Sequence, residues 1–140
     1  MPTASPRYVI TVYGDKYAAF LGPLLESILD RATPTQGPSG PIGTVIWQTI
    51  RPSEVALLQR FYPNFEFVES SFPSGDDIMH AIPRKMYAWL QGAKRFADEP
   101  VCFVDCDTVI HRPVEELFDG SWDILFTWKD ELYPINTGVM

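Results

Sequence analysis

The sequence contains few of the features that mark disulfide-rich, nucleic-acid-binding or membrane proteins. Only two of its 140 residues are cysteine. Cys102 and Cys106 lie four positions apart around one predicted strand end, where a mutual disulfide is geometrically unfavourable. The 11 Lys and Arg residues against 18 Asp and Glu give a net charge of −7, which argues against non-specific nucleic-acid binding. An anionic ligand stays compatible with this charge, because a metal ion can supply positive charge locally.

Long apolar runs are also lacking. No segment approaches the roughly 20 apolar residues of a membrane span, and the N-terminus has no apolar run typical of a signal peptide. We therefore expect no transmembrane segment and a cytoplasmic location. The hydrophobic content of 46% is typical of a packed globular domain, and 140 residues suffice for one domain with a core of its own. The chain stops in mid-pattern at INTGVM, so we expect the N-terminal portion of a larger fold whose second half is absent.

The apolar pattern predicts strands that alternate with helices. Helical spacing follows Asp15, an N-cap candidate, and Gly22-Pro23 interrupts it, so this helix is expected to start late or to kink. Further helices are predicted after Pro52 and from Pro83 onward. Strands are predicted over residues 7–12, 44–50, 66–69, 101–104 and 123–128. This alternation predicts an α/β layered fold with a mainly parallel sheet flanked by helices.

The segment VCFVDCD, residues 101–107, carries the clearest chemical signal. Its wholly apolar first part is typical of a strand buried on both faces. Asp105 and Asp107 follow at the carboxyl end, where open α/β sheets bind ligands. Residues i and i+2 of an extended segment project to the same side, so both carboxylates can face one point. Two converging anions favour a hard divalent cation, Mn²⁺ or Mg²⁺, that leaves coordination positions for phosphate oxygens. A capping Asp and a turn Asp are the structural alternative.

The segment VCFVDCDTVIHRPVEELF resembles the Asp-x-Asp region of GT-A glycosyltransferases, and most closely the family 8 group that includes glycogenin and bacterial galactosyl- and glucosyltransferases. Three further segments match in the expected order: the opening strand and turn (residues 10–17), RKMYAW before the motif strand, and INTGVM, which is similar to the family's Asn-Ser-Gly-Val strand. The resemblance implies a Rossmann-like GT-A fold in a single nucleotide-sugar-binding domain over residues 1–140. It also implies a metal-dependent glycosyltransferase that moves a hexose from a nucleotide-diphosphate sugar, with UDP-sugar expected.

The resemblance also implies roles for individual residues. Asp105 and Asp107 would be the catalytic pair that holds Mn²⁺, or Mg²⁺, against the donor diphosphate, and Asp105 would also reach the ribose or the sugar. The nucleotide- and sugar-binding residues would be Tyr13, Asp15, Tyr17, Lys85, Asp105, Asn136 and Gly138. Helix capping alone explains Asp15, and a solvated helix face explains Lys85 equally well. The acceptor, a saccharide, protein or lipid, is left open, as are the donor sugar and the stereochemical outcome.

Two other functions stay open at this point. The run VCFVDCDTV also matches the Asp-x-Asp motif of haloacid-dehalogenase-type phosphatases, in which Asp105 would be the nucleophile and Asp107 a general acid. That motif normally lies on the first strand, whereas three strand-like segments precede it here. The third hypothesis is an inactive, truncated binding module.

Overall fold

Four parallel strands form the central sheet. The computed structural model describes residues 5–31, 40–73, 81–118, 127–128 and 135–136. The strand order is β3-β2-β1-β4, and all three neighbouring pairs are parallel, as the sequence predicted. The strands are β1 (Arg7–Tyr13), β2 (Gly43–Gln48), β3 (Phe65–Glu69) and β4 (Val101–Asp105).

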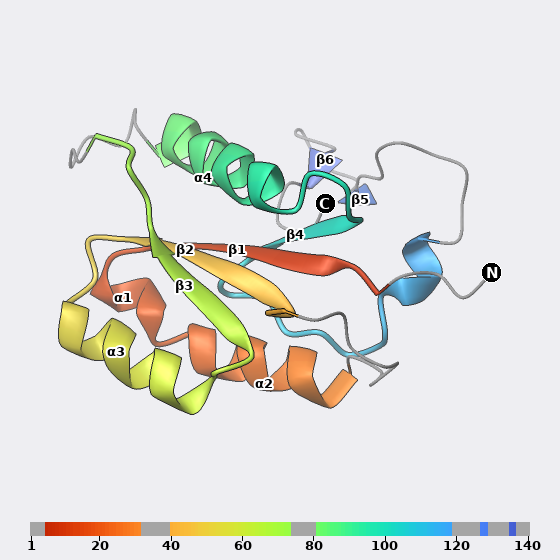
Figure 1. The fold of residues 1–140 in the computed structure, drawn as a ribbon, viewed down its shortest axis with the longest axis horizontal. Helices are drawn as coiled ribbons and strands as arrows, with labels where there is room; N and C mark the ends of the chain where they lie inside the picture. Colours follow the sequence, from red (N-terminus) through yellow and green to blue (C-terminus); the bar gives the residue numbers. More distant parts are fainter. Residues whose placement is uncertain (1–4, 32–39, 74–80, 119–126, 129–134, 137–140) are drawn as a thin grey trace.

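Helices cover both faces of this sheet (Figure 1). The helices on one face are α1 (Asp15–Ala18), α2 (Leu21–Arg31) and α3 (Pro52–Phe61). Helix α4 (Ala81–Arg95) lies alone on the other face. Beyond β4 follow a short 3₁₀ helix, η2 (Glu115–Phe118), and a two-stranded antiparallel sheet of β5 (Thr127–Trp128) and β6 (Ile135–Asn136). Among the described residues, no helix has the length and apolar content needed to cross a bilayer.

Alternation along the strands divides their side chains between two hydrophobic cores. The core beneath α1, α2 and α3 includes Ile10, Leu21, Leu24, Leu25, Ile28, Val45 and Val104. The core beneath α4 contains Val9, Ile46, Ala88, Trp89 and Phe96. Helix α4 approaches β1 closely at Gly92, where an added Cβ would lie 2.4 Å from Cγ1 of Val9. These contacts fix the N-terminal half of α4 beside the carboxyl ends of β1 and β2.

Two helix starts differ from the sequence-based prediction. The first helical stretch is divided into α1 and α2, so the main helix does start late, but Gly14 and not Asp15 occupies the N-cap position of α1. Helix α4 begins at Ala81, two residues before Pro83. Proline is tolerated there because the N–H groups of a first helical turn have no intrahelical acceptor.

Strand β4 is fully buried on one face and only half-buried on the other. The prediction that both faces are buried is therefore wrong for the second face. Cys102 and Val104 are buried, whereas Val101, Phe103 and Asp105 are half-buried. The reason is that α4 packs over β1 and β2 and covers β4 incompletely. Phe103 meets α4 through the ring of Trp89, at a centroid distance of 5.2 Å.

Candidate functional site

The carboxyl ends of β1 and β4 meet where the strand order reverses. The chain runs outward from β1 to β2 and β3 through helices on one face, and α4 then carries it across the opposite face to β4, beside β1 (Figure 1). Open α/β sheets bind ligands in the crevice outside the carboxyl strand ends at such a switch point. The register pairs Thr11 with Asp105 here. The Asp-x-Asp segment therefore begins at the position that this topology favours for a ligand site.

Asp105 is joined to helix α4 by an ion pair. Its Oδ1 lies 2.6 Å from Nζ of Lys85, and both side chains are partly exposed, at 29% and 26%. The same ammonium group lies 4.8 Å from the ring centroid of Trp89. An ion pair with this exposure contributes at most about 1 kcal/mol to stability. The position of this ion pair matters more than its energy, because it brings two residues that are distant in sequence together at the switch point.

Asp107 lies in a turn and not on the strand. Strand β4 ends at Asp105, and the N–H of Thr108 donates to the Asp105 carbonyl at 3.2 Å. The argument that Asp105 and Asp107 share one side of an extended segment is therefore wrong, because the chain turns from Cys106 onward. Asp107 is exposed at this turn.

The residue between the two aspartates is structural. Cys106 is buried and belongs to the core beneath α1, α2 and α3. Burial first, and then the charges of Asp107 and Asp105, raise the pKa of its thiol to about 11. A buried thiol with a raised pKa has little thiolate character at neutral pH, which is typical of a structural cysteine. Cys106 thus anchors the turn, and Cys102 is likewise a free, buried thiol, consistent with the expectation that the two are unpaired.

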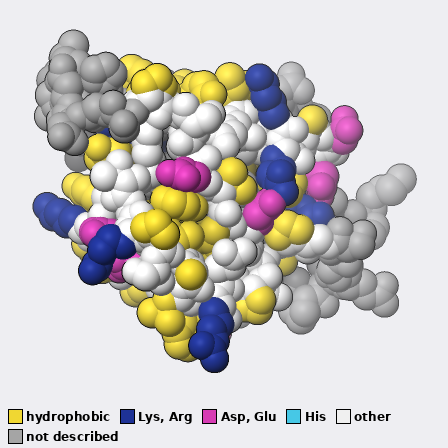
Figure 2. All heavy atoms as spheres, turned by 60° about the vertical axis from the view of Figure 1, so that its left-hand side comes forward, with side chains coloured by type: hydrophobic (Ala, Val, Ile, Leu, Met, Phe, Trp, Pro, Cys, Tyr) yellow, Lys and Arg dark blue, Asp and Glu magenta, His cyan; other side chains and the backbone are white. Residues whose placement is uncertain are grey.

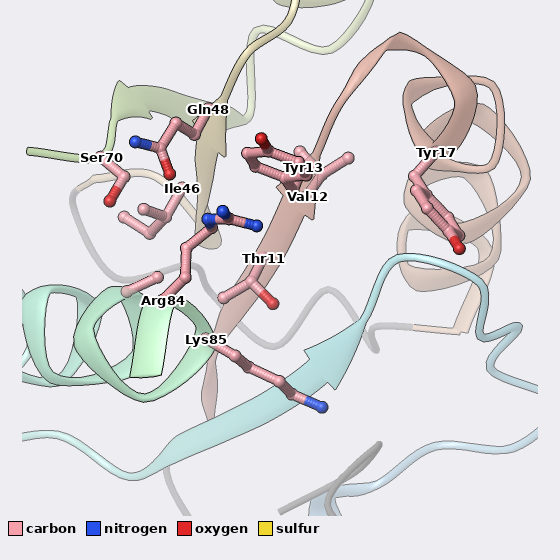
Figure 3. A pocket seen from close by; sticks show the side chains of 10 residues that line it. Thr11, Val12, Tyr13, Tyr17, Ile46, Gln48, Ser70, Arg84 and Lys85 are labelled. Atoms are coloured by element: carbon pink, nitrogen blue, oxygen red, sulfur yellow. The ribbon is translucent and has the colours of Figure 1, made fainter. Parts of the chain in front are cut away.

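A cavity of about 230 Å³ adjoins the ion pair at the carboxyl ends of β1 and β2 (Figure 3). Its lining combines apolar, aromatic and cationic side chains. The residues that line it are Thr11, Val12, Tyr13, Tyr17, Ile46, Gln48, Ser70, Arg84, Lys85 and Ala88. Lys85 belongs both to this wall and to the ion pair with Asp105, so it links the cavity to Asp105, which does not itself line the cavity.

A stacked cation and ring form part of the cavity wall. The Arg84 guanidinium carbon lies 3.5 Å from the centroid of the Tyr13 ring, and Arg84 is 9% exposed. Contact between a guanidinium group and a tyrosine ring is favourable, particularly when desolvated. Together with Lys85 it gives the cavity a cationic side that suits an anionic ligand. The chain is acidic overall, and Figure 2 shows acidic and basic side chains interspersed with apolar ones on this side of the molecule.

Sequence reasoning missed Gln48 and Ser70. Gln48 is the last residue of β2 and lies opposite Tyr13 in the register, and the N–H of Gly14 donates to its carbonyl at 2.9 Å. Ser70 follows β3 directly and donates its backbone N–H to the Trp47 carbonyl. A usable signal was present, because each is a polar residue at the carboxyl end of a predicted parallel strand, and such ends meet at one edge of the sheet.

The other predicted site residues fall into three groups. Tyr13 and Tyr17 line the cavity. Asp15 does not: its carboxylate accepts from the backbone N–H of Arg51 at 3.0 Å and pairs with the Arg51 guanidinium at 3.1 Å, which ties α1 to the start of α3. Of Asn136 only the backbone is described, in β6 opposite Thr127, and Gly138 lies outside the described residues.

Asp105 and Asp107 are the metal ligands that the sequence predicts. Among the residues that the structure describes, no group of three or more His, Cys, Asp or Glu side chains is arranged to hold a metal. Mg²⁺ and similar ions are commonly held by one or two carboxylates, with water and substrate phosphates in the remaining positions. Asp105 and Asp107 would need a bound diphosphate to complete such a coordination sphere, and Oδ1 of Asp105 already pairs with Lys85.

Comparisons with known proteins support the fold. No family model matches this sequence, and no curated protein matches it. Among solved structures, the chain is similar to the apo structure of WbbM, a bifunctional glycosyltransferase, with 19% sequence identity and a TM-score of 0.50. The match covers 86% of this chain and 21% of that chain, so the present chain spans a minor part of WbbM. The α/β architecture, with its four-stranded parallel sheet flanked by helices, is that of a Rossmann-like glycosyltransferase fold.

Proposed function

We propose that this chain forms the donor-binding part of a metal-dependent glycosyltransferase of the GT-A type, similar to family 8. Its reaction would transfer a hexose from a UDP-sugar to a saccharide, protein or lipid acceptor. The observation that carries the proposal is the Lys85–Asp105 ion pair, which joins a partly cationic cavity to the Asp-x-Asp segment at the switch point of the sheet. Similarity to the fold of a glycosyltransferase supports the same reading.

The cavity suits the base and ribose of the donor. Its volume of about 230 Å³ is below the 300–1,000 Å³ range of pockets that enclose a whole drug-sized ligand. It therefore suits one end of an elongated ligand better than an entire UDP-sugar. Tyr13 and Tyr17 provide aromatic surface, and the Tyr13 ring with its stacked guanidinium forms a flat wall of the kind on which a base can lie.

Lys85 and the two aspartates then meet the diphosphate. A ligand that leaves the cavity past Lys85 reaches Asp105 directly, since their side chains are 2.6 Å apart. The Lys85 ammonium would bind phosphate oxygens as a point charge. Asp105 and Asp107 would hold Mn²⁺ or Mg²⁺, whose chemistry is to offset the negative charge that gathers on the departing diphosphate. Asn136 and Gly138 are proposed to line the sugar pocket, on the resemblance alone.

Calorimetric titration of the 140-residue chain with UDP, with and without Mn²⁺, tests this function. We expect Mn²⁺ to strengthen UDP binding, and Asp107→Ala to abolish that strengthening. Asp98→Ala is the matched control, because Asp98 is an exposed aspartate that follows α4 and precedes the amino end of β4. In a full-length transferase, the loss of Asp107 would lower the rate on the order of 10³-fold. UDP binding that is absent, or equal with and without the metal and in both variants, would contradict the proposal.

A second assay, turnover of p-nitrophenyl phosphate, separates the phosphatase alternative. A lysine beside an aspartate also suits phosphoryl transfer, with Asp105 as nucleophile and Lys85 binding the phosphoryl oxygens. That reading predicts Mg²⁺-dependent turnover of p-nitrophenyl phosphate and no preference for a nucleotide. The transferase reading is favoured because the cavity extends along β1 and β2, which provides room for a group attached to the phosphates.

A further inference from the structure

A buried hydrogen-bond acceptor lies in the wall of the cavity. Gln48 is 6% exposed, and its Oε1 has no hydrogen-bond partner among the described residues. Leaving a buried polar group unsatisfied is costly, on the order of the desolvation penalty of that group. Gln48 lines the cavity, and Figure 3 shows its amide oxygen on the side of Ile46 and Arg84. A ligand that donates a hydrogen bond to Oε1 would remove this penalty.

The orientation of the Gln48 amide is fixed by its other end. Nε2 donates to the backbone carbonyl of Phe72 at 2.5 Å. A carbonyl can only accept, so a rotation of the amide by half a turn would place two acceptors against each other. Gln48 therefore turns an acceptor, and not a donor, toward Ile46 and Arg84 in the cavity wall.

A donor lies beside this acceptor. The Ser70 Oγ accepts from the N–H of Phe72 at 3.3 Å, and its hydroxyl hydrogen can be donated to a ligand. Ser70 is 8% exposed and lines the same cavity as Gln48. Contacts to Phe72 hold both side chains, since its carbonyl binds Gln48 and its N–H binds Ser70. The wall thus offers an acceptor and a donor side by side from two neighbouring strand ends.

On this basis we propose that Gln48 and Ser70 form a specificity element that reads the imide edge of uracil, which rests on the nucleotide-binding function proposed above. The N3–H of uracil would donate to Oε1 of Gln48, and the O4 carbonyl would accept from the Ser70 hydroxyl. Cytosine presents the opposite pattern along the same edge: an unprotonated N3 faces Oε1, and an amino group faces Ser70. The site would therefore discriminate against a cytosine nucleotide at the edge where the two pyrimidines differ.

Calorimetric titration of the 140-residue chain with UDP and with CDP, both with Mn²⁺, tests this inference. We expect UDP to bind at least about 10-fold more tightly, the size that follows from a lost hydrogen bond with a buried acceptor left unsatisfied. Gln48→Met should bring the ratio of the two affinities close to one. Gln91→Met is the matched control. Gln91 also donates from Nε2 to a backbone carbonyl, that of Glu69 at 3.4 Å, and its buried Oε1 also has no partner among the described residues. Unlike Gln48, Gln91 does not line the cavity.

An altered ligand gives the same test without a substitution. UDP methylated at N3 cannot donate to Oε1, and we expect unsubstituted protein to bind it at least about 10-fold more weakly than UDP. This arm applies even if Gln48→Met fails to fold. Equal binding of UDP, CDP and N3-methyl-UDP would overturn the role of Gln48 and Ser70 while leaving the nucleotide site intact. Absence of binding by every nucleotide would overturn the proposed function itself, and this inference with it.

Discussion

Replacing Gly92 by alanine would create a steric clash that displaces α4 from the sheet. The added Cβ would lie 2.4 Å from Cγ1 and 2.9 Å from Cγ2 of Val9, whereas carbon atoms pack at about 3.5–4.0 Å. Val9 is fully buried in β1, and its branched side chain has little rotameric freedom, so the helix must move by about 1 Å. Overpacking of this kind costs about 1–3 kcal/mol, and the higher helix propensity of alanine returns up to about 1 kcal/mol. We expect a net destabilisation of about 1–2 kcal/mol.

Urea unfolding of Gly92→Ala and of the unsubstituted chain measures this difference. Gly22→Ala in α2 is the matched control, because its Cβ would meet only Oη of Tyr62 at an ordinary 3.6 Å. That variant should lie closer to neutral than Gly92→Ala, because Pro23 disfavours helical backbone at the residue before it and so offsets the helix propensity of alanine. Adding Val9→Ala to Gly92→Ala should show a coupling of about 1 kcal/mol, since the second change removes the clash. Equal stability of Gly92→Ala and Gly22→Ala would refute the close approach of α4 to β1.

Two further predictions concern the site and its supporting thiols. Lys85→Met should weaken UDP binding about 10-fold, because a charge-assisted contact with phosphate is lost. Lys94→Met, on the exposed side of the same helix, should leave UDP affinity unchanged. Equal UDP affinities of the two variants in calorimetry would exclude Lys85 from the site. Burial raises the pKa of the Cys106 thiol to about 11 and that of Cys102 to about 12, from an ordinary 9.0. Between pH 9.0 and these raised pKa values, the two thiols bind fewer protons in the unfolded chain than in the folded protein. The free energy of unfolding should therefore fall as pH rises above 9.0. Urea unfolding across this range checks the fall, which should be smaller in a Cys102→Ala, Cys106→Ala double variant. The raised pKa of Tyr62 leaves part of the fall in that variant.

The alternation of strands and helices could be predicted because it depends on local patterns. Apolar periodicity located β1, β2, β3 and β4, and Pro52 marked the first turn of α3 as expected. Boundaries were less well predicted where a neighbouring element decides them. Strand β2, for example, runs from Gly43 to Gln48 and stops short of the predicted Ile50, because Thr49 has a φ of 57° and turns the chain out of the sheet.

The partial exposure of β4 shows a second limit. The apolar run before Asp105 was interpreted as a strand covered on both faces, but Phe103 is only half-buried. Composition records how apolar a strand is and not how much of it the next helix covers. Here α4 packs closely against β1 at Gly92, and it therefore covers β4 incompletely.

The sequence by itself determined the layered α/β architecture and the presence of two carboxylates at the end of an apolar strand, because both are written in short-range periodicity and in adjacent residues. Only the tertiary structure decided which distant residues join them. Lys85 reaches Asp105, and Gln48 and Ser70 line the same cavity, because the strand order brings four strand ends and one helix together at the edge of the sheet. Such proximity arises from long-range packing: a local pattern marks polar residues at strand ends, but it does not say which of them share a cavity.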